Sequence, residues 1–200
     1  LNLTPLDVGM KLRELFLKSK KSWIFTSATI AIGEDFSHFK ERIGLVGAME
    51  ASFPSPFALE DNALIYLPSG LPEPSHLKFT EKMLAATLPL LKLVSGGIFF
   101  LFTSHHALSK AKTWFKAKQK ILNGRLLLVQ GDSPRDDMLK KFRADGNAIL
   151  LGTGSFWEGV DVRGEALNMV VIDKLPFRSP ADPLMMARLE YIKKNGGNGF

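Results

Sequence analysis

Length, composition and charge narrow the class of protein. The 200 residues include 26 Lys and Arg against 20 Asp and Glu, a formal net charge of +6 that mildly favours a polyanionic partner. Cysteine is absent, which excludes disulfides and thiolate metal sites within the chain. Lys, Gly or Pro interrupts each apolar segment before it reaches the ~18 residues of a membrane span, so we expect no membrane association. We expect a cytoplasmic location, and the absence of Cys fits a reducing compartment.

Taken in chain order, the sequence predicts helices that alternate with short apolar strands. A capping box, Thr4-Pro5-Leu6-Asp7, begins a first helix that three lysines at 18, 20 and 21 close. Further helices are expected over 34–43, 80–93, 108–122, 133–146 and 183–194, and strands over 23–25, 63–67, 98–102, 126–129, 148–151 and 169–172. Ser133 repeats the capping-box start, and Gly44 is an expected helix stop. This alternation predicts right-handed βαβ units and one mainly parallel sheet.

A Gly-rich loop over 152–161 stands between the apolar runs 148–151 and 169–172. A buried strand that ends in such a loop is a usual place for a phosphate or nucleic-acid site in an α/β sheet. Gly154 and Gly159 have the outer spacing of a P-loop, but Val160-Asp161 stands where Lys-Ser/Thr is required. The dinucleotide-binding fingerprint also fails, because Trp157 occupies the position of its third glycine. The alternative is a turn-rich surface loop.

Three other loops are expected at the same edge of the sheet, over 26–29, 102–106 and 130–133. Loops that follow parallel strands all emerge at the carboxyl edge, so their hydroxyls, amides and glycines should form one polar surface. Groups of this kind bind a sugar–phosphate backbone without reading its sequence. His105 and His106 lack the further ligands of a metal site, so we expect no bound metal.

The same segments carry a resemblance to a known family. Thr-Ser-Ala-Thr-Ile at 26–30, Phe-Thr-Ser at 102–104, Leu-Val-Gln-Gly at 128–131 and Gly-Ser-Phe-Trp-Glu-Gly-Val-Asp at 154–161 resemble superfamily 2 helicase motifs. With Asp-Lys-Leu-Pro-Phe at 173–177 and Ser-Pro at 179–180, their order and spacing resemble the DinG/YoaA branch of the XPD-like helicases. The similarity runs from about residue 4 to the end of the chain.

This resemblance implies a RecA-like fold with three layers, α/β/α, and a mainly parallel sheet. In that family two RecA-like domains bind ATP with Mg²⁺ between them and move 5′ to 3′ along single-stranded DNA. The chain would be the second domain: residues 1–30 lead into it, and 31–200 form it up to a point before the arginine-finger motif. Its partners would be single-stranded DNA and the first RecA-like domain. Any iron–sulfur cluster would belong to that first domain.

The resemblance also assigns roles to residues. Ser27, Ala28 and Thr29 would couple nucleotide state to DNA binding, and Glu158, Gly159 and Asp161 would face the nucleotide cleft. The DNA contacts would come from Thr103, Ser104, Gln130, Gly131, Ser155, Trp157 and Arg178. For Trp157 two hypotheses stand side by side: the indole stacks on a base, or it packs beneath the loop.

The chain lacks the motifs that cleave ATP. It has no Gly-Lys-Ser/Thr loop, no Asp-Glu-x-His and no arginine-finger segment, so no catalytic residue is assigned. We expect the parent protein to be an ATP-dependent DNA helicase and the 200 residues alone to be inactive. The alternative is a non-enzymatic module that binds nucleic acid or protein and keeps the same fold.

Overall fold

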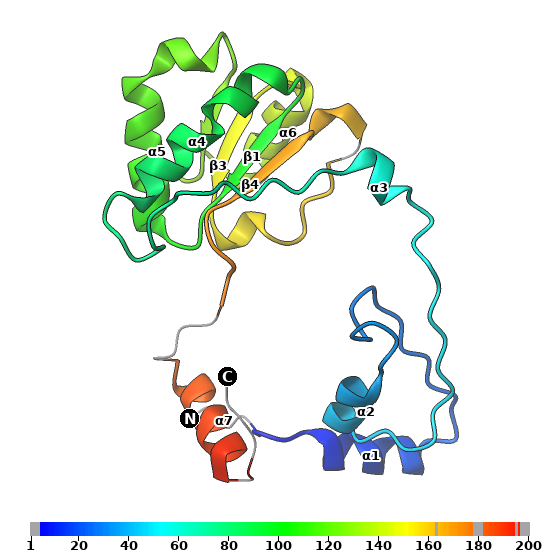
Figure 1. Cartoon of the computed structure of the whole chain (residues 1–200). Helices are drawn as coiled ribbons and strands as arrows, with labels where there is room; N and C mark the ends of the chain where they lie inside the picture. The colour runs from blue at the N-terminus through cyan, green and yellow to red at the C-terminus, as the bar shows by residue number, and fades with distance from the viewer. Residues whose placement is uncertain (1–4, 163, 178–181, 195, 197–200) are drawn as a thin grey trace. The chain divides into compact units, whose positions relative to one another are not determined.

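A computed structural model describes residues 5–162, 164–177, 182–194 and 196 of the chain (Figure 1). The chain divides into two compact units, one formed by Leu1–Leu64 with Arg178–Phe200 and the other by Ile65–Phe177. The predicted division at residue 30, which concerns the domains of the parent protein, stays a prediction.

The second unit, 65–177, is built on four parallel strands. They are β1 (Ile98–Leu101), β2 (Leu127–Val129), β3 (Ile149–Gly152) and β4 (Met169–Ile172), in the spatial order β2-β3-β1-β4. In the register, Ile98 of the central strand β1 lies beside Ile149 of β3 and Met169 of β4. All residues of β1 and β3 are buried, as expected for central strands that are apolar on both faces. The predicted α/β fold with a parallel sheet is confirmed.

Helices cover both faces of this sheet (Figure 1). They are α4 (Phe79–Leu93), α5 (His105–Ala117) and α6 (Arg135–Asp145), with 3₁₀ helices η1 (Gln119–Leu122), η2 (Gly154–Phe156) and η3 (Gly164–Ala166). Because side chains alternate along a strand, Phe100 of β1 packs in the core with α4 and α5, whereas Phe99 packs with Phe142 of α6. The unit therefore has three layers, with the sheet in the middle.

The edge strand β4 is covered less completely than its neighbour. Val170 and Ile172 are 47% and 45% exposed, although the β1 residues beside them in the sheet, Phe99 and Leu101, are buried. The α6 layer thus covers β1, β2 and β3 and leaves this apolar face of β4 half open.

In this unit the starts of α5 and α6 differ from the prediction by two or three residues, because the sequence does not reveal which residue caps the helix. α5 begins at His105 and not at 108, since the Ser104 hydroxyl oxygen accepts the backbone N–H of Ala107 at 3.2 Å and caps the helix. It ends at Ala117, and η1 takes over the rest of the expected helix. The sequence predicts Ser133 as the N-cap of α6. In the structure α6 begins at Arg135, its N-cap is Pro134, and no side-chain hydrogen bond caps the helix. Pro89 lies inside α4, which continues to Leu93.

The first unit contains α1 (Gly9–Lys18), α2 (Ser37–Ile43), α3 (Leu59–Asn62) and α7 (Pro183–Lys194). The start of α1 and the end of α2 approach closely at two glycines. Gly44 ends α2 in the left-handed conformation at φ 71°, as predicted, and a Cβ there would meet the carbonyl oxygen of Gly9 at 2.3 Å. Thr4 of the expected capping box lies outside the described residues. Within them, α1 begins at Gly9 and not at Pro5 as predicted, and the Asp7 carboxylate accepts the backbone N–H of Gly9 at 2.7 Å. α2 likewise begins at Ser37 and not at 34, after Asp35, whose carboxylate accepts the backbone N–H of Ser37 at 2.8 Å.

The predicted strands over 23–25 and 63–67 are wrong, because the described residues there form no ladder. The aromatic rings of the first segment pack against a helix instead. Trp23 and Phe25 lie 5.1 and 5.7 Å from the ring of Phe16 in α1, measured between centroids. Residues 63–67 are exposed and extended, without a neighbouring strand in the described part of the chain.

None of the described helices has the length and apolar character that a bilayer crossing demands.

Candidate nucleic-acid interface at the carboxyl edge of the sheet

The loops after all four strands of the sheet lie at one edge, and hydrogen bonds join them in the spatial order of the strands. The first link connects β2 to β3. The side-chain carbonyl of Gln130, directly after β2, accepts the backbone N–H of Thr153 at 2.6 Å and its hydroxyl at 3.0 Å. This contact uses the side-chain oxygen of Gln130 and fixes the amide, so its NH₂ group remains available to donate hydrogen bonds to a ligand.

The second link connects β3 to β1 through Trp157. Its indole N–H donates to the backbone carbonyl of Phe102 at 3.4 Å. Trp157 follows η2, where the buried ring of Phe156 folds back beneath the loop onto Gly152. A Cβ on Gly152 would lie 2.8 Å from that ring, so only glycine allows the loop to close over its own core residue.

The third link connects β1 to β4. The carboxylate of Asp173 accepts the backbone N–H of Thr103 at 2.9 Å and its hydroxyl at 3.4 Å. Asp173 is only 7% exposed, and this burial raises its pKa above the ordinary value for Asp, although the hydrogen bonds from Thr103 and Lys174 oppose the shift. Thr103 is therefore held in place by a group on the neighbouring strand.

Two arginines of α6 hold the long loop over 153–161 from outside. Arg135 donates to the backbone carbonyls of Ser155 at 3.0 Å, Glu158 at 3.2 Å and Gly159 at 2.9 Å. Its guanidinium also lies 5.7 Å from the centroid of the Phe156 ring. Arg143 donates to the carbonyl of Asp161 at 2.8 Å. One face of α6 thus fixes the backbone of the loop that carries most of the predicted site residues.

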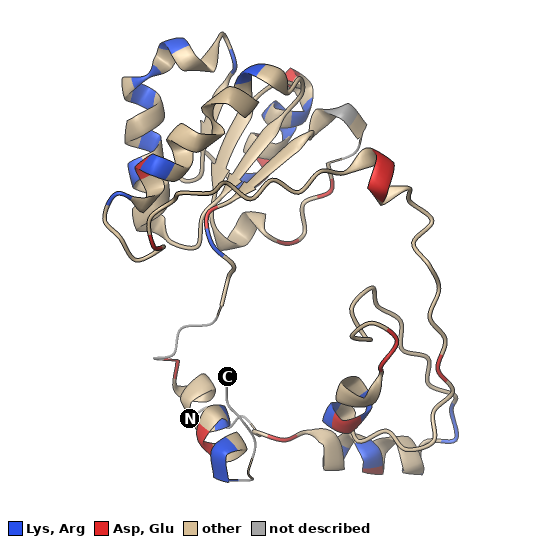
Figure 2. Cartoon of the chain, in the orientation of Figure 1, with Lys and Arg blue, Asp and Glu red and all other residues tan. Residues whose placement is uncertain are grey.

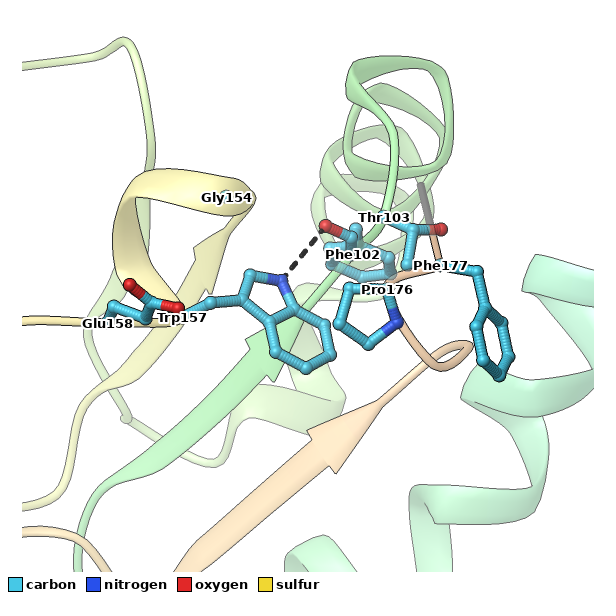
Figure 3. A pocket seen from close by; sticks show the side chains of 7 residues that line it. All are labelled: Phe102, Thr103, Gly154, Trp157, Glu158, Pro176 and Phe177. Atoms are coloured by element: carbon cyan, nitrogen blue, oxygen red, sulfur yellow. Dashed lines mark hydrogen bonds between the residues drawn. The ribbon is translucent and has the colours of Figure 1, made fainter. Parts of the chain in front are cut away.

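A cavity of about 390 Å³ opens among the loops after β1, β3 and β4 (Figure 3). Its lining residues are Phe102, Thr103, Gly154, Trp157, Glu158, Pro176 and Phe177. Trp157 is half-buried: it packs against the core beneath the loop and also lines this cavity. The two arrangements that the sequence left open for its ring, packing and exposure to a ligand, coexist in the geometry.

The structure brings the described members of the predicted DNA-contacting set together, but two of them have local structural roles. Thr103, Gln130, Ser155 and Trp157 belong to the linked loops of the edge. Ser104 is used as the N-cap of α5, and Gly131 forms the turn after β2 at φ 96°, where the left-handed conformation favours glycine. Glu158, Gly159 and Asp161 follow on the loop that α6 holds.

The predicted coupling residues lie in the first unit. They do not follow a strand of the sheet, contrary to the expectation that their loop shares its carboxyl edge, because residues 23–25 form no strand. The Ser27 hydroxyl accepts the backbone N–H of Thr29 at 3.2 Å and lies 3.3 Å from the Thr29 hydroxyl, so with Ala28 between them they form a local turn. Arg178 lies outside the described residues.

Sequence reasoning missed the groups that position the site. Arg135 and Arg143 were not predicted at all. Thr153 in the loop over 152–161 and Asp173 in the motif over 173–177 were noted, but not as the groups that hold Gln130 and Thr103. Each of the four is a polar residue at a strand end or on the first or last turn of α6, and such a position could have indicated a role in holding the loops. Their partners become apparent only when the order β2-β3-β1-β4 is known.

Basic residues are spread along α5 and α6 (Figure 2), and several have partners within the unit. Lys112 pairs with Asp132 at 2.5 Å, Lys110 donates to the carbonyl of Leu77 at 3.1 Å, and Lys118 lies over the ring of Trp114. The described residues include no cluster of three or more His, Cys, Asp or Glu with the placement of metal ligands.

The chain is similar in sequence to a known domain family and to several curated proteins. A family model described as the helicase C-terminal domain matches residues 87–200. Over its whole length the chain is 40% identical to the Escherichia coli protein named ATP-dependent DNA helicase YoaA, of which it covers 31%, and 34% identical to the Photobacterium profundum protein named ATP-dependent DNA helicase DinG, of which it covers 30%. Over 98% of its length it is 34% identical to the Bacillus subtilis protein named 3′-5′ exonuclease DinG, of which it covers 22%.

The chain thus spans less than a third of the length of these curated relatives. The family model, however, matches more than half of the chain, and it matches the part that contains the sheet and its linked loops. The chain therefore belongs to the helicase C-terminal domain family and is a RecA-like α/β domain of the DinG/YoaA type.

Proposed function

We propose that this chain is the second RecA-like motor domain of an ATP-dependent 5′–3′ DNA helicase, and that its carboxyl edge binds single-stranded DNA. The observation that carries the proposal is the set of cross-strand hydrogen bonds that joins the four loops of this edge. Hydroxyls, an amide donor and a cavity with aromatic walls lie next to one another there. Such a surface suits a flexible strand whose backbone needs donors and whose bases need stacking partners.

The finer roles in this proposal are those that the family resemblance implies. Thr103, Ser104, Gln130, Gly131, Ser155, Trp157 and Arg178 contact the DNA. Glu158, Gly159 and Asp161 form one wall of a cleft in which ATP and Mg²⁺ are shared with the first RecA-like domain, and Ser27, Ala28 and Thr29 couple the two functions. The enzyme acts in the cytoplasm. Arg135 supports the proposal, because one side chain holds the carbonyls of both the DNA-facing and the nucleotide-facing parts of the loop.

The chemistry in the parent enzyme is transfer of the γ-phosphoryl group of ATP to water, which needs positioned phosphates, a metal and an arginine finger. ATP·Mg²⁺ would supply the leaving group and the charge-neutralising ion. The residues of this chain position the loop and hold DNA. We therefore expect the isolated 200 residues to hydrolyse no ATP, with or without single-stranded DNA, in a phosphate-release assay.

The test uses the intact protein that carries this chain, with DNA binding, DNA-stimulated ATP hydrolysis and unwinding measured together. Ser155→Ala removes an exposed hydroxyl and leaves the backbone contact of Ser155 to Arg135 intact. We expect DNA affinity to fall about two- to tenfold, the value of one net hydrogen bond. Ser109→Ala, an exposed serine on α5, is the matched control and should leave affinity unchanged.

The outcomes separate the motor from its rival. A motor hydrolyses ATP faster with single-stranded DNA and unwinds duplexes that carry a 5′ overhang but not those with a 3′ overhang. DNA binding without DNA-stimulated hydrolysis would instead indicate a non-enzymatic binding module. Equal loss of affinity in Ser155→Ala and Ser109→Ala would contradict the placement of DNA on this edge.

A further inference from the structure

The cavity at the carboxyl edge has walls of a particular kind. Trp157 and Phe177 lie on either side of Pro176 (Figure 3), so a flat apolar group can contact an aromatic ring. The Trp157 ring is held by its bond to the carbonyl of Phe102, which satisfies the indole N–H away from any ligand. Phe177 is 85% exposed, and an aromatic ring left open beside a cavity marks a surface that a partner covers.

The polar groups of the cavity favour a base over a phosphate. Of its seven lining residues, all among those described, none is Lys or Arg, and Glu158 is a carboxylate. A phosphate would be repelled by this charge and would find no cation to pair with. A carboxylate accepts hydrogen bonds, and cytosine offers it an exocyclic NH₂ group with two N–H donors, whereas thymine offers only its single ring N3–H. The Thr103 hydroxyl donates to Asp173, which leaves its own oxygen as a further acceptor.

We propose that this cavity takes a single nucleobase that bears an exocyclic amino group, stacked against Trp157 or Phe177 with the amino group toward Glu158. The inference rests on the proposed function, because it takes the carboxyl edge to be the nucleic-acid surface, but it assigns Glu158, which lines this cavity, to the base and not to the ATP wall. The volume of about 390 Å³ lies in the range of sites that enclose small ligands. The base comes either from single-stranded DNA or from a free nucleotide, since both present the same ring and the same amino donor.

The experiment uses 2-aminopurine, a fluorescent base with an exocyclic amino group whose emission falls when it stacks. The intact protein is titrated in one arm with an oligothymidylate that carries one central 2-aminopurine, and in the other with 2-aminopurine riboside triphosphate. Anisotropy of a terminal dye reports binding of the oligonucleotide independently. Quenching in the first arm assigns the cavity to a DNA base, and quenching only in the second assigns it to a nucleotide. Either result supports the proposal when Phe177→Ala weakens it, because the proposed ATP cleft of the intact protein also binds a triphosphate.

Variants connect the quenching to the cavity. Phe177→Ala removes an exposed ring, so the fold should be unaffected, and we expect the affinity for the quenched ligand to fall at least about fivefold. Leu175→Ala, a similarly exposed apolar residue that does not line the cavity, is the control and should change nothing. Glu158→Gln, which keeps the side-chain size but removes the charge, should reduce the preference for oligodeoxycytidylate over oligothymidylate toward unity.

The failure of this proposal is distinct from the failure of the proposed function. Oligonucleotide binding by anisotropy, with unchanged 2-aminopurine emission in both arms, would overturn the base cavity and leave the DNA-binding edge standing. Equal effects of Phe177→Ala and Leu175→Ala would overturn it as well. Absence of both DNA binding and quenching would overturn the two together.

Discussion

Arg135→Ala tests how the long loop of the carboxyl edge is held. The guanidinium donates to three loop carbonyls and lies over the Phe156 ring, with about a third of the side chain exposed. A hydrogen bond from a charged donor contributes ~1.5–3 kcal/mol when buried, but exposure and competition from water bring each one here closer to ~0.5–1 kcal/mol. With ~0.5 kcal/mol from the cation–π contact, the substitution should weaken the closed loop by about 2–3 kcal/mol.

Two measurements test this loss of loop stability. Hydrogen exchange of the amides over 155–159 should accelerate by about 30-fold or more relative to the unsubstituted protein, since 1.4 kcal/mol corresponds to a factor of ten. DNA-stimulated ATP hydrolysis of the intact protein should fall, because the two predicted functional parts of the loop are no longer fixed to one another.

Arg143→Ala is the matched control, because it removes a single bond from the same helix to the same loop. Its effect on exchange should be several times smaller. Arg135→Lys should recover less than half of the loss, since an ammonium group lacks the planar fork that reaches several carbonyls at once. Equal exchange rates in Arg135→Ala and Arg143→Ala, or full recovery by lysine, would refute the reasoning.

Three further substitutions probe the site. Gly152→Ala places a methyl group against the Phe156 ring, so we expect a loss of about 1–3 kcal/mol in the free energy of unfolding, measured by urea denaturation; an unchanged midpoint would contradict the close packing. Burial raises the pKa of Asp173, so the folded state binds this proton more tightly than the unfolded chain, and its contribution to stability falls as pH rises above about 4. Urea midpoints measured between pH 4 and 7 should therefore vary less with pH in Asp173→Asn than in the unsubstituted protein. Gln130→Glu keeps the acceptor oxygen but adds a negative charge, so the fold should survive while single-stranded DNA binds more weakly, most clearly at low salt.

The sequence predicts the sheet well because its four strands are short apolar runs that helices separate. The runs at 98–102 and 148–151 are apolar on both faces, and the structure buries both. The same criterion fails at 23–25 and 63–67. An apolar or aromatic run becomes a strand only when a neighbour pairs with it, and composition does not reveal whether that neighbour exists. Trp23 and Phe25 find rings of helices instead.

For the candidate site, the sequence predicts which loops meet but not how they are joined. Loops that end parallel strands share an edge, so the grouping of Thr103, Gln130 and Trp157 is predictable from topology class alone. That Gln130 faces Thr153, and Thr103 faces Asp173, depends on the spatial order of strands, which differs from the order along the chain. The hydrogen bonds are therefore properties of the tertiary fold, and no local pattern encodes them.

The unpaired edge of strand β4 affects how the protein behaves in solution. It pairs with β1 on one side, and on its other side the described residues supply no further strand. Backbone donors and acceptors along this border can template pairing with another molecule, and the apolar Val170 and Ile172 would strengthen the contact. The isolated 200 residues should therefore self-associate as their concentration rises. A lysine in place of Val170 should suppress this, because charge on an exposed sheet border discourages the addition of strands.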